Sequence, residues 1–176
     1  MKLYSVSDDY INYLRKFEDK VMLNTGDLYI HTRKYLGTVI NIDGFKYYCP
    51  LSSGKRGTDY FPDGTPRPSV VPIIRIVGFD KNGKAEVKGT LLLSNMIPVP
   101  DSELIEYDHQ NETERKYKDL IDLELEFINI NKELIKKNAN RIYKEKKLKL
   151  NHIGYIKNTI NFKLLEKRHD EWVKSK

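Results

Sequence analysis

The spacing of hydrophobic residues changes twice along the chain and divides its 176 residues into three parts. Over residues 8–21 hydrophobic side chains recur every three or four positions, which predicts a first helix with Ser7 as its N-cap. Over about 37–100, short β-branched runs separated by turn residues predict a small antiparallel sheet. Over about 111–173 the helical spacing returns and predicts about three helices.

The first hairpin is predicted where Asp43-Gly44 separates two runs of β-branched or aromatic residues, over 38–42 and 45–49. Both turn residues tolerate the positive φ that a two-residue hairpin turn requires. We expect the second strand to end at Pro50, because proline has no N–H for a further ladder bond.

A second hairpin is predicted over 70–77 and 85–93, with Asn82-Gly83 in its turn. Residues 96–100 close the β region, which is expected to begin only after the first helix. Between the hairpins lies a polar loop over 52–68. Its length in a compact domain indicates either a functional loop or a mobile one.

A long amphipathic helix is predicted after the sheet, with Asn111 and Glu114 as its cap. We expect a break at 138–140 and then a basic helical segment that ends at Leu150. The hydrophobic residues of the long helix form one set with steps of three and four and one set that repeats every seven: Leu120, Leu123, Phe127, Ile130 and Leu134, and Ile121, Ile128 and Ile135. A last helix is marked by Phe162, Leu165, His169 and Trp172.

This order of elements predicts an α+β fold, with a compact, strongly curved antiparallel sheet or barrel, an N-terminal helix and C-terminal helices. A doubly wound parallel sheet is disfavoured, because strands and helices do not alternate along the chain. The length predicts one domain over 1–176. Hydrophobic residues make up 39% of the chain and charged residues 32%, which supports one modest core and excludes disorder throughout.

Composition also bears on where the protein resides. No run approaches the ~18 consecutive apolar residues of a membrane helix, and the start of the chain turns acidic where a signal peptide is apolar. The single cysteine, Cys49, cannot form an internal disulfide, and its apolar strand favours packing over nucleophilic chemistry. We therefore expect a soluble, cytoplasmic protein.

Positive charge is concentrated in one segment. Residues 132–149 contain eight Lys or Arg and two Glu, a net of +6 that equals the formal charge of the whole chain. Residues 101–128, just before this segment, carry a net of −7. Such a basic stripe favours a polyanionic partner, and the twelve tyrosines offer stacking surfaces for unpaired bases. A solvated helix face with tyrosines in the core is the alternative.

The segment Ser52-Ser53-Gly54-Lys55-Arg56 has the side chains best suited to chemistry. Two hydroxyls, a flexible glycine and two cations directly after a strand can surround one phosphate. Cutting RNA without metal requires such cations, a donor for the leaving 5′-oxygen and a group that accepts the proton of the attacking 2′-OH. An ordinary surface turn is the alternative. A nucleotide-binding P-loop is excluded, because its required Gly and Ser/Thr positions hold Cys49 and Arg56.

A second cluster, from Tyr29 to Tyr35, places aromatic, imidazole and guanidinium groups just before the first predicted strand. A flipped base can stack on either tyrosine while Arg33 holds a phosphate. The alternative is a loop whose tyrosines pack on the sheet edge. The four histidines, at 31, 109, 152 and 169, lack the spacing of metal ligands, so we expect neither a metal site nor another cofactor.

Several short segments follow one another in the order and spacing of a known family: Met1-Lys2-Leu3-Tyr4-Ser5-Val6, Tyr10, Tyr13-Leu14, Phe17-Glu18-Asp19-Lys20-Val21, Arg33-Lys34-Tyr35-Leu36-Gly37, Tyr48-Cys49-Pro50-Leu51-Ser52-Ser53-Gly54-Lys55, Asn95-Met96-Ile97-Pro98-Val99, and Tyr117 with Leu125-Glu126-Phe127-Ile128. In these segments the chain resembles the ToxN/AbiQ family, the endoribonuclease toxins of type III toxin-antitoxin and abortive-infection systems. Together they extend along most of the sequence.

The resemblance implies a curved antiparallel sheet similar to that of MazF/Kid toxins. It implies metal-independent, sequence-specific cleavage of cellular or phage mRNA, which leaves a 2′,3′-cyclic phosphate and a 5′-OH and inhibits bacterial growth in phage defence. It also implies that the toxin processes a repeated precursor into a small pseudoknotted RNA, which then inhibits it. Three toxins with three RNAs, or one of each, are the implied assemblies.

The same resemblance implies an active site at three positions. Ser53 would orient or activate the reacting group at the scissile phosphate, Ser52 would support it by hydrogen bonding, and Lys55 would stabilise the phosphorane charge. The general base stays open, because Ser and Lys are poor bases at their ordinary pKa values. The remaining residues expected to contact RNA are those of the surrounding pocket and of the basic segment: Tyr10, Tyr29, Arg33, Lys34, Arg56, Lys144, Lys146, Lys147 and Lys149.

Two other functions are compatible with the sequence. A non-catalytic RNA-binding module would use the same basic helix and tyrosines to hold structured RNA. A DNA-acting regulator would use the long helix as a dimer zipper, although the broad apolar face of that helix favours packing on the sheet.

Overall fold

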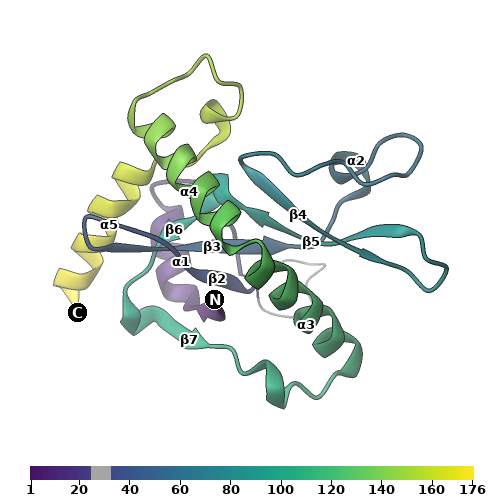
Figure 1. Ribbon diagram of the computed structural model, residues 1–176. Helices are drawn as coiled ribbons and strands as arrows, with labels where there is room; N and C mark the ends of the chain where they lie inside the picture. Colours follow the sequence, from purple (N-terminus) through teal and green to yellow (C-terminus); the bar gives the residue numbers. More distant parts are fainter. Residues whose placement is uncertain (25–32) are drawn as a thin grey trace.

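The computed structural model describes residues 1–24 and 33–176 and contains a seven-stranded sheet with flanking helices (Figure 1). The strand pairs are antiparallel, in the spatial order β4-β5-β3-β2-β1-β7, and β6 pairs with β3. The α+β class and the antiparallel sheet are therefore confirmed. The strands are β1 (Lys2–Val6), β2 (Tyr35–Ile42), β3 (Phe45–Ser52), β4 (Ile73–Phe79), β5 (Ala85–Leu92), β6 (Ile97–Pro98) and β7 (Leu104–Glu106).

Strand β3 lies inside this order and changes neighbours along one edge. One edge pairs with β2, and on the other edge Tyr47 and Tyr48 pair with β6 before Leu51 and Ser52 pair with β5. The ladder ends at β4 and β7, which do not pair with each other among the described residues. The sheet is therefore open, and the predicted barrel is not confirmed.

Both predicted hairpins are confirmed. Asp43 and Gly44 have φ angles of 52° and 87° between β2 and β3. Gly83 has a φ of 76° in the turn between β4 and β5. The first turn thus has positive φ at both residues, as expected for Asp-Gly, whereas the second has positive φ at Gly83 but not at Asn82.

The prediction that Pro50 ends its strand is wrong, because β3 continues to Ser52. Pro50 lies opposite Tyr35, whereas the next residue, Leu51, donates its N–H to the Lys34 carbonyl at 2.9 Å. The missing N–H of Pro50 therefore falls on the other edge of β3. On that edge the strand is passing from β6 to β5, so no regular ladder bond is lost.

Two short strands, β1 and the edge strand β7, were not predicted. They pair with each other, and β1 also pairs with β2, so the sheet does not begin after the first helix as expected. With five and three residues they are too short for a clear alternating pattern. The first helix, α1 (Asp8–Arg15), is shorter than predicted, but Ser7 caps it by accepting the Tyr10 N–H at 3.3 Å.

The helical region differs from the prediction at its break and at its first cap. The break lies at Asn131 rather than at 138–140, because the Asn131 backbone leaves the helical conformation, with φ of −99° and ψ of 15°, and its side-chain amide donates to the Phe127 carbonyl at 2.8 Å. Asn111 does not cap the long helix and donates to Asp108 instead. The helices after the sheet begin and end as follows: α3 (Arg115–Ile130), α4 (Lys132–Lys147) and α5 (Phe162–Ser175).

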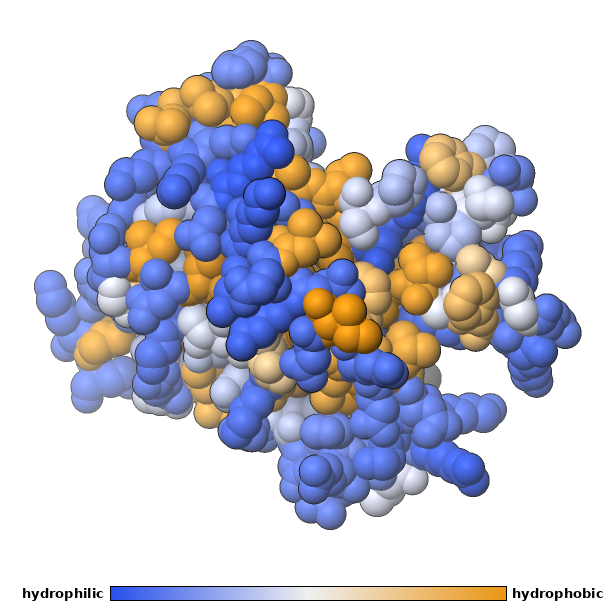
Figure 2. All heavy atoms as spheres, in the orientation of Figure 1, coloured by the Kyte–Doolittle hydropathy of each residue, from blue (hydrophilic) through white to orange (hydrophobic). Residues whose placement is uncertain are grey.

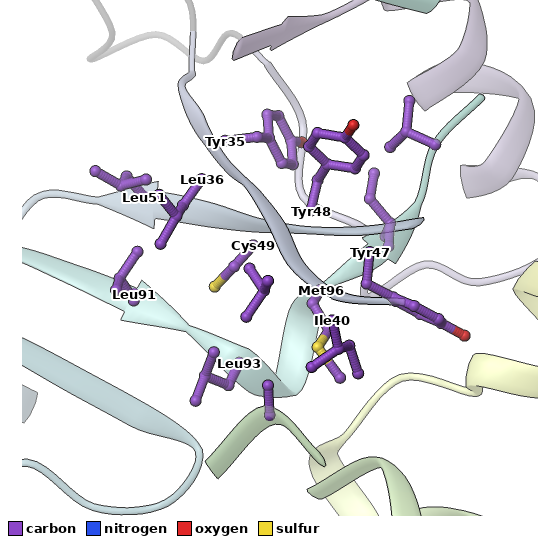
Figure 3. Packing of buried hydrophobic residues seen from close by; sticks show 14 of the residues in the cluster. Tyr35, Leu36, Ile40, Tyr47, Tyr48, Cys49, Leu51, Leu91, Leu93 and Met96 are labelled. Atoms are coloured by element: carbon purple, nitrogen blue, oxygen red, sulfur yellow. The ribbon is translucent and has the colours of Figure 1, made fainter. Parts of the chain in front are cut away.

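The hydrophobic core lies between the sheet and helices α4 and α5 (Figure 1). Leu36 and Cys49 lie on the same side of the strands as Leu91, Leu93 and Met96, whereas Tyr35 and Tyr48 lie on the other side (Figure 3). From the long hydrophobic stretch, the set that repeats every seven residues is buried, whereas the other set is half-buried or exposed. Within the described residues, no helix has the length and apolar character needed to cross a membrane.

Glu124 is a buried carboxyl on the face of α3 that packs against β5. It is 5% exposed, and burial raises its pKa to about 8. Gly89 of β5 leaves the space for this carboxyl, because an added Cβ there would collide with the Glu124 Oε1. The contact between α3 and β5 therefore contains a group that is stable there mainly in its neutral form.

Glu124→Gln is expected to make the free energy of unfolding less dependent on pH. The folded-state pKa lies above the ordinary value of 4.5, so this contribution to stability is complete below about pH 4.5 and is lost as the pH rises toward 8. The Gln variant lacks this loss, so its free energy of unfolding near pH 8 should exceed that of wild type by roughly 2 to 4 kcal/mol. Urea unfolding across this range measures the difference. The exposed Glu126→Gln on the same helix is the control, and parallel curves for wild type and Glu124→Gln would contradict the prediction.

Candidate active site

The three residues predicted to be catalytic lie together where β3 ends. Ser52 is the last residue of the strand and is largely buried, and its carbonyl accepts a hydrogen bond from Thr90 Oγ1 at 3.1 Å. Ser53 is the first residue beyond the strand and is exposed, as is Lys55. Lys55 is the N-cap residue of the short helix α2 (Arg56–Asp59). The loop directly after β3 therefore presents the Ser53 hydroxyl and the Lys55 ammonium to solvent.

A buried ion pair between Asp59 and Arg75 anchors this loop to the protein interior. Asp59 Oδ2 accepts the backbone N–H of Lys55 at 2.8 Å, and Asp59 Oδ1 accepts Arg75 Nε at 2.9 Å. Arg75, on β4, also donates to the Thr58 carbonyl at 3.3 Å and the Pro68 carbonyl at 2.7 Å. The Arg75 guanidinium thus connects two parts of the loop, α2 and Pro68, to β4 of the sheet.

Sequence reasoning missed this pair, although one signal was available. Arg75 interrupts an otherwise apolar strand, β4, and a cation buried inside such a run requires a partner. The position of that partner, sixteen residues earlier at Asp59, carried no comparable signal.

Arg33 lies beside the end of β3 but is directed into the protein. Its Nη1 donates to the Leu51 carbonyl at 2.7 Å and its Nε to the Leu23 carbonyl at 2.8 Å. The side chain is 5% exposed. Arg33 was expected to contact a phosphate directly, whereas the structure uses its guanidinium to hold the strand immediately before Ser52.

Two other residues that were expected to contact RNA are partly or fully buried. Tyr10 has no exposed surface, its hydroxyl donates to the Pro98 carbonyl at 2.8 Å and its ring packs against Trp172, so it is not available to RNA in this structure. Lys34 is half-buried, with its Nζ 4.2 Å from the centre of the Tyr107 ring, and burial lowers its pKa. Tyr29 lies outside the described residues.

The basic residues at the end of α4 form a second group, apart from the end of β3 (Figure 1). Lys144, Lys147 and Lys149 are exposed. Lys146 donates to the Ile156 carbonyl at 2.9 Å, and burial lowers its pKa. Lys163 of α5, which was not predicted, joins Lys146, Lys147 and Lys149 around a pocket of about 310 Å³.

The chemistry available at the end of β3 is that of an anion site. Lys55 and Arg56 are exposed cations on successive residues, beside the Ser53 hydroxyl. Cations in a fixed loop can stabilise negative charge that develops on a phosphate without reorganising first. Within 1–24 and 33–176, no three His, Cys, Asp or Glu side chains are grouped so that they could hold a metal ion.

Comparison with known proteins supports a specific family. Residues 2–170 match the model of the family described as toxin ToxN of the type III toxin-antitoxin system. The endoribonuclease ToxN of Pectobacterium atrosepticum is 29% identical over 175 residues, which cover 99% of this chain and 95% of that protein.

Solved structures give the same result at the level of the fold. The lactococcal anti-phage endoribonuclease AbiQ, of a type III toxin-antitoxin system, superposes with a TM-score of 0.77 at 29% identity, covering 98% of both chains. A structure that concerns selective toxin inhibition by a non-coding RNA pseudoknot superposes with a TM-score of 0.76 at 28% identity, covering 97% of this chain and 96% of the other.

Arg75→Met is expected to destabilise the protein by about 3 to 5 kcal/mol, because it leaves the Asp59 carboxylate buried without its cation. Replacing both partners, as Asp59→Asn with Arg75→Met, should recover part of this loss. Arg141→Met, which breaks the exposed Arg141–Glu145 pair on α4, is the control and should change little. Denaturant unfolding measures all three, and equal effects of the two Arg→Met variants would contradict the prediction.

Proposed function

The chain belongs to the ToxN toxin family of type III toxin-antitoxin systems, and from this membership we propose that it is a metal-independent endoribonuclease toxin. The observation that carries the proposal is the loop after β3, which presents Ser53, Lys55 and Arg56 to solvent while Asp59 and Arg75 fix it from inside. The relatives named above are endoribonucleases, which agrees with this site.

In the proposed reaction, the 2′-oxygen of one nucleotide attacks the adjacent phosphorus. A bond forms between phosphorus and the 2′-oxygen, the bond from phosphorus to the 5′-oxygen breaks, and the 2′-OH proton is removed while the leaving oxygen gains one. The products are a 2′,3′-cyclic phosphate and a 5′-OH. Lys55 stabilises the additional negative charge of the phosphorane, and Ser53 orients the phosphate. Ser52 supports Ser53 through its position at the fixed end of the strand.

A small RNA is the proposed inhibitor and is also a product of the enzyme. We assign its backbone to the basic end of α4, where three exposed lysines lie close in sequence. The proposed assembly is a closed complex of three proteins and three RNAs, with a one-to-one complex as the alternative. This partner is supported by the relative whose structure concerns inhibition by an RNA pseudoknot.

Ser53→Ala and Lys55→Met are each expected to reduce RNA cleavage roughly a hundredfold or more, because each removes a group that contacts the reacting phosphate. The measurement is incubation of each purified protein with long single-stranded RNA in EDTA, followed by analysis of the new ends. Exposed residues distant in sequence, in Ser102→Ala and Lys81→Met, serve as controls. RNA that stays intact with well-folded wild-type protein would favour a non-catalytic RNA-binding module.

Charge reversal of Lys144, Lys147 and Lys149 to Glu is expected to weaken binding of the inhibitory RNA and to flatten its salt dependence. Each phosphate that is no longer neutralised should reduce the slope of log K against log salt by about 0.7 to 0.9. Reversal of Lys81, Lys116 and Lys174, which are exposed outside residues 132–149, is the matched control. Equal binding by both triple variants would contradict the assignment of the RNA to the end of α4.

A further inference from the structure

A pocket of about 780 Å³ opens beside the loop that carries Ser53 and Lys55. It lies between the segment after α2 and the turn of the β4–β5 hairpin, and Gly54 and Arg56 form its end nearest the candidate active site. Its other walls include Tyr60, Phe61, Lys84 and Val87. Gly54 is seated tightly on the pocket wall, since an added Cβ would lie 2.9 Å from Val87 Cγ1.

The wall on the α2 side is held by hydrogen bonds. The hydroxyl of Tyr60 accepts the backbone N–H of Val87 at 2.8 Å, which ties this wall to β5. Phe61 donates its N–H to the Thr65 carbonyl at 2.8 Å, and its carbonyl accepts the Gly64 N–H at 2.9 Å. The segment that presents Phe61 is therefore a closed turn rather than an extended loop.

The hairpin wall is equally well ordered. The Asp80 carboxylate accepts the N–H of Asn82 at 2.8 Å and that of Lys84 at 2.9 Å, and these bonds lower the Asp80 pKa. Lys84 extends across the pocket, because a Cβ added to Gly64 would lie 3.5 Å from its Nζ. A pocket with both walls fixed in advance loses little conformational entropy when it binds a ligand.

The chemical character of the pocket fits a nucleotide. Phe61 is 41% exposed although the Arg67 guanidinium lies over its ring at 4.6 Å, so aromatic surface remains for a planar ligand. Arg56 and Lys84 are the two cationic residues of the pocket lining. Of the two carboxylates in the walls, Asp80 is bonded to its own turn and Glu86 to Lys88 at 2.6 Å. Hydrophobic and hydrophilic residues lie side by side over this part of the molecule, at the right of Figure 2.

We propose that this pocket binds one unpaired nucleotide of the RNA substrate adjacent to the scissile phosphate and thereby contributes to the choice of cleavage site. The base stacks on Phe61, and Arg56 and Lys84 attract the neighbouring phosphates. The inference rests on the proposed function. It commits to the substrate strand because the pocket is continuous with the loop of Ser53 and Lys55, and a cleaved polymer must continue beyond its scissile phosphate.

Phe61→Ala tests this assignment, with Phe79→Ala as the matched control. Phe79 is the last residue of β4, in the hairpin that forms the other wall; it is 70% exposed and does not line the pocket. Each protein is incubated with a long RNA of mixed sequence, and the cut sites are mapped by sequencing. We expect Phe61→Ala to keep the cyclic-phosphate ends, to raise KM about tenfold and to lose base preference at one position beside the cut. Phe79→Ala should retain wild-type preference and KM.

Three further variants separate the loss of a nucleotide contact from a general effect on folding. Phe61→Leu preserves apolar volume without an aromatic face and should show the same loss of preference as Phe61→Ala. Lys84→Ala should raise KM, whereas Lys81→Ala, in the same turn but outside the pocket, should not.

Three results would overturn the inference. Phe61 variants that cut with unchanged base preference and KM would remove the substrate nucleotide from the pocket. Loss of inhibitory-RNA binding with intact base preference would assign the pocket to the inhibitor instead. A well-folded wild-type protein that cuts no RNA would overturn the proposed function itself, and the inference with it.

Discussion

The structure depends on strand β3, which is held along both edges by different neighbours. Its first half pairs with β6 and its last two residues with β5, while β2 runs along its other edge. Tyr47, Tyr48 and Cys49 bury its middle in the core. A strand held in this way cannot slip in register without exposing buried side chains and breaking bonds on both sides. The residue that follows it, Ser53, therefore leaves the sheet at a fixed point.

The same strand connects the two regions that we assign to RNA. Near its start, the Tyr47 hydroxyl donates to the buried Glu166 of α5 at 2.8 Å, and Glu166 also accepts Tyr143 of α4 at 2.6 Å and Lys163 at 2.6 Å. These bonds join the basic end of α4 to the sheet. At its other end β3 leads into the loop of Ser53. The distance between the candidate active site and the basic end of α4 is thus set by one strand.

The loop after β3 has polar side chains both on its exposed side and on its buried side, and the two groups have different roles. Outside, Lys55 and Arg56 face solvent, where phosphate can reach them. Inside, Arg33, Asp59 and Arg75 are buried and direct their hydrogen bonds to backbone groups and to each other. Burying charges has a desolvation cost that an apolar cluster would avoid. The buried layer, however, holds the exposed cations in place before substrate arrives, which is what electrostatic stabilisation of a reacting phosphate requires.

The sequence by itself determined the features that depend on a few neighbouring residues. Asp43-Gly44 predicted a hairpin because the φ preferences of these two residues are local. Ser52, Ser53 and Lys55 could be recognised as one group because they are close in the chain. Tertiary structure alone decided which polar groups face solvent and which face the core. The Tyr10 hydroxyl donates to the Pro98 carbonyl, and the Arg33 guanidinium donates to the Leu51 carbonyl. Arg75 likewise donates to the Asp59 carboxylate. These partners are separated along the chain, so their contacts arise only when the sheet and helices pack, and no local pattern in the sequence encodes them.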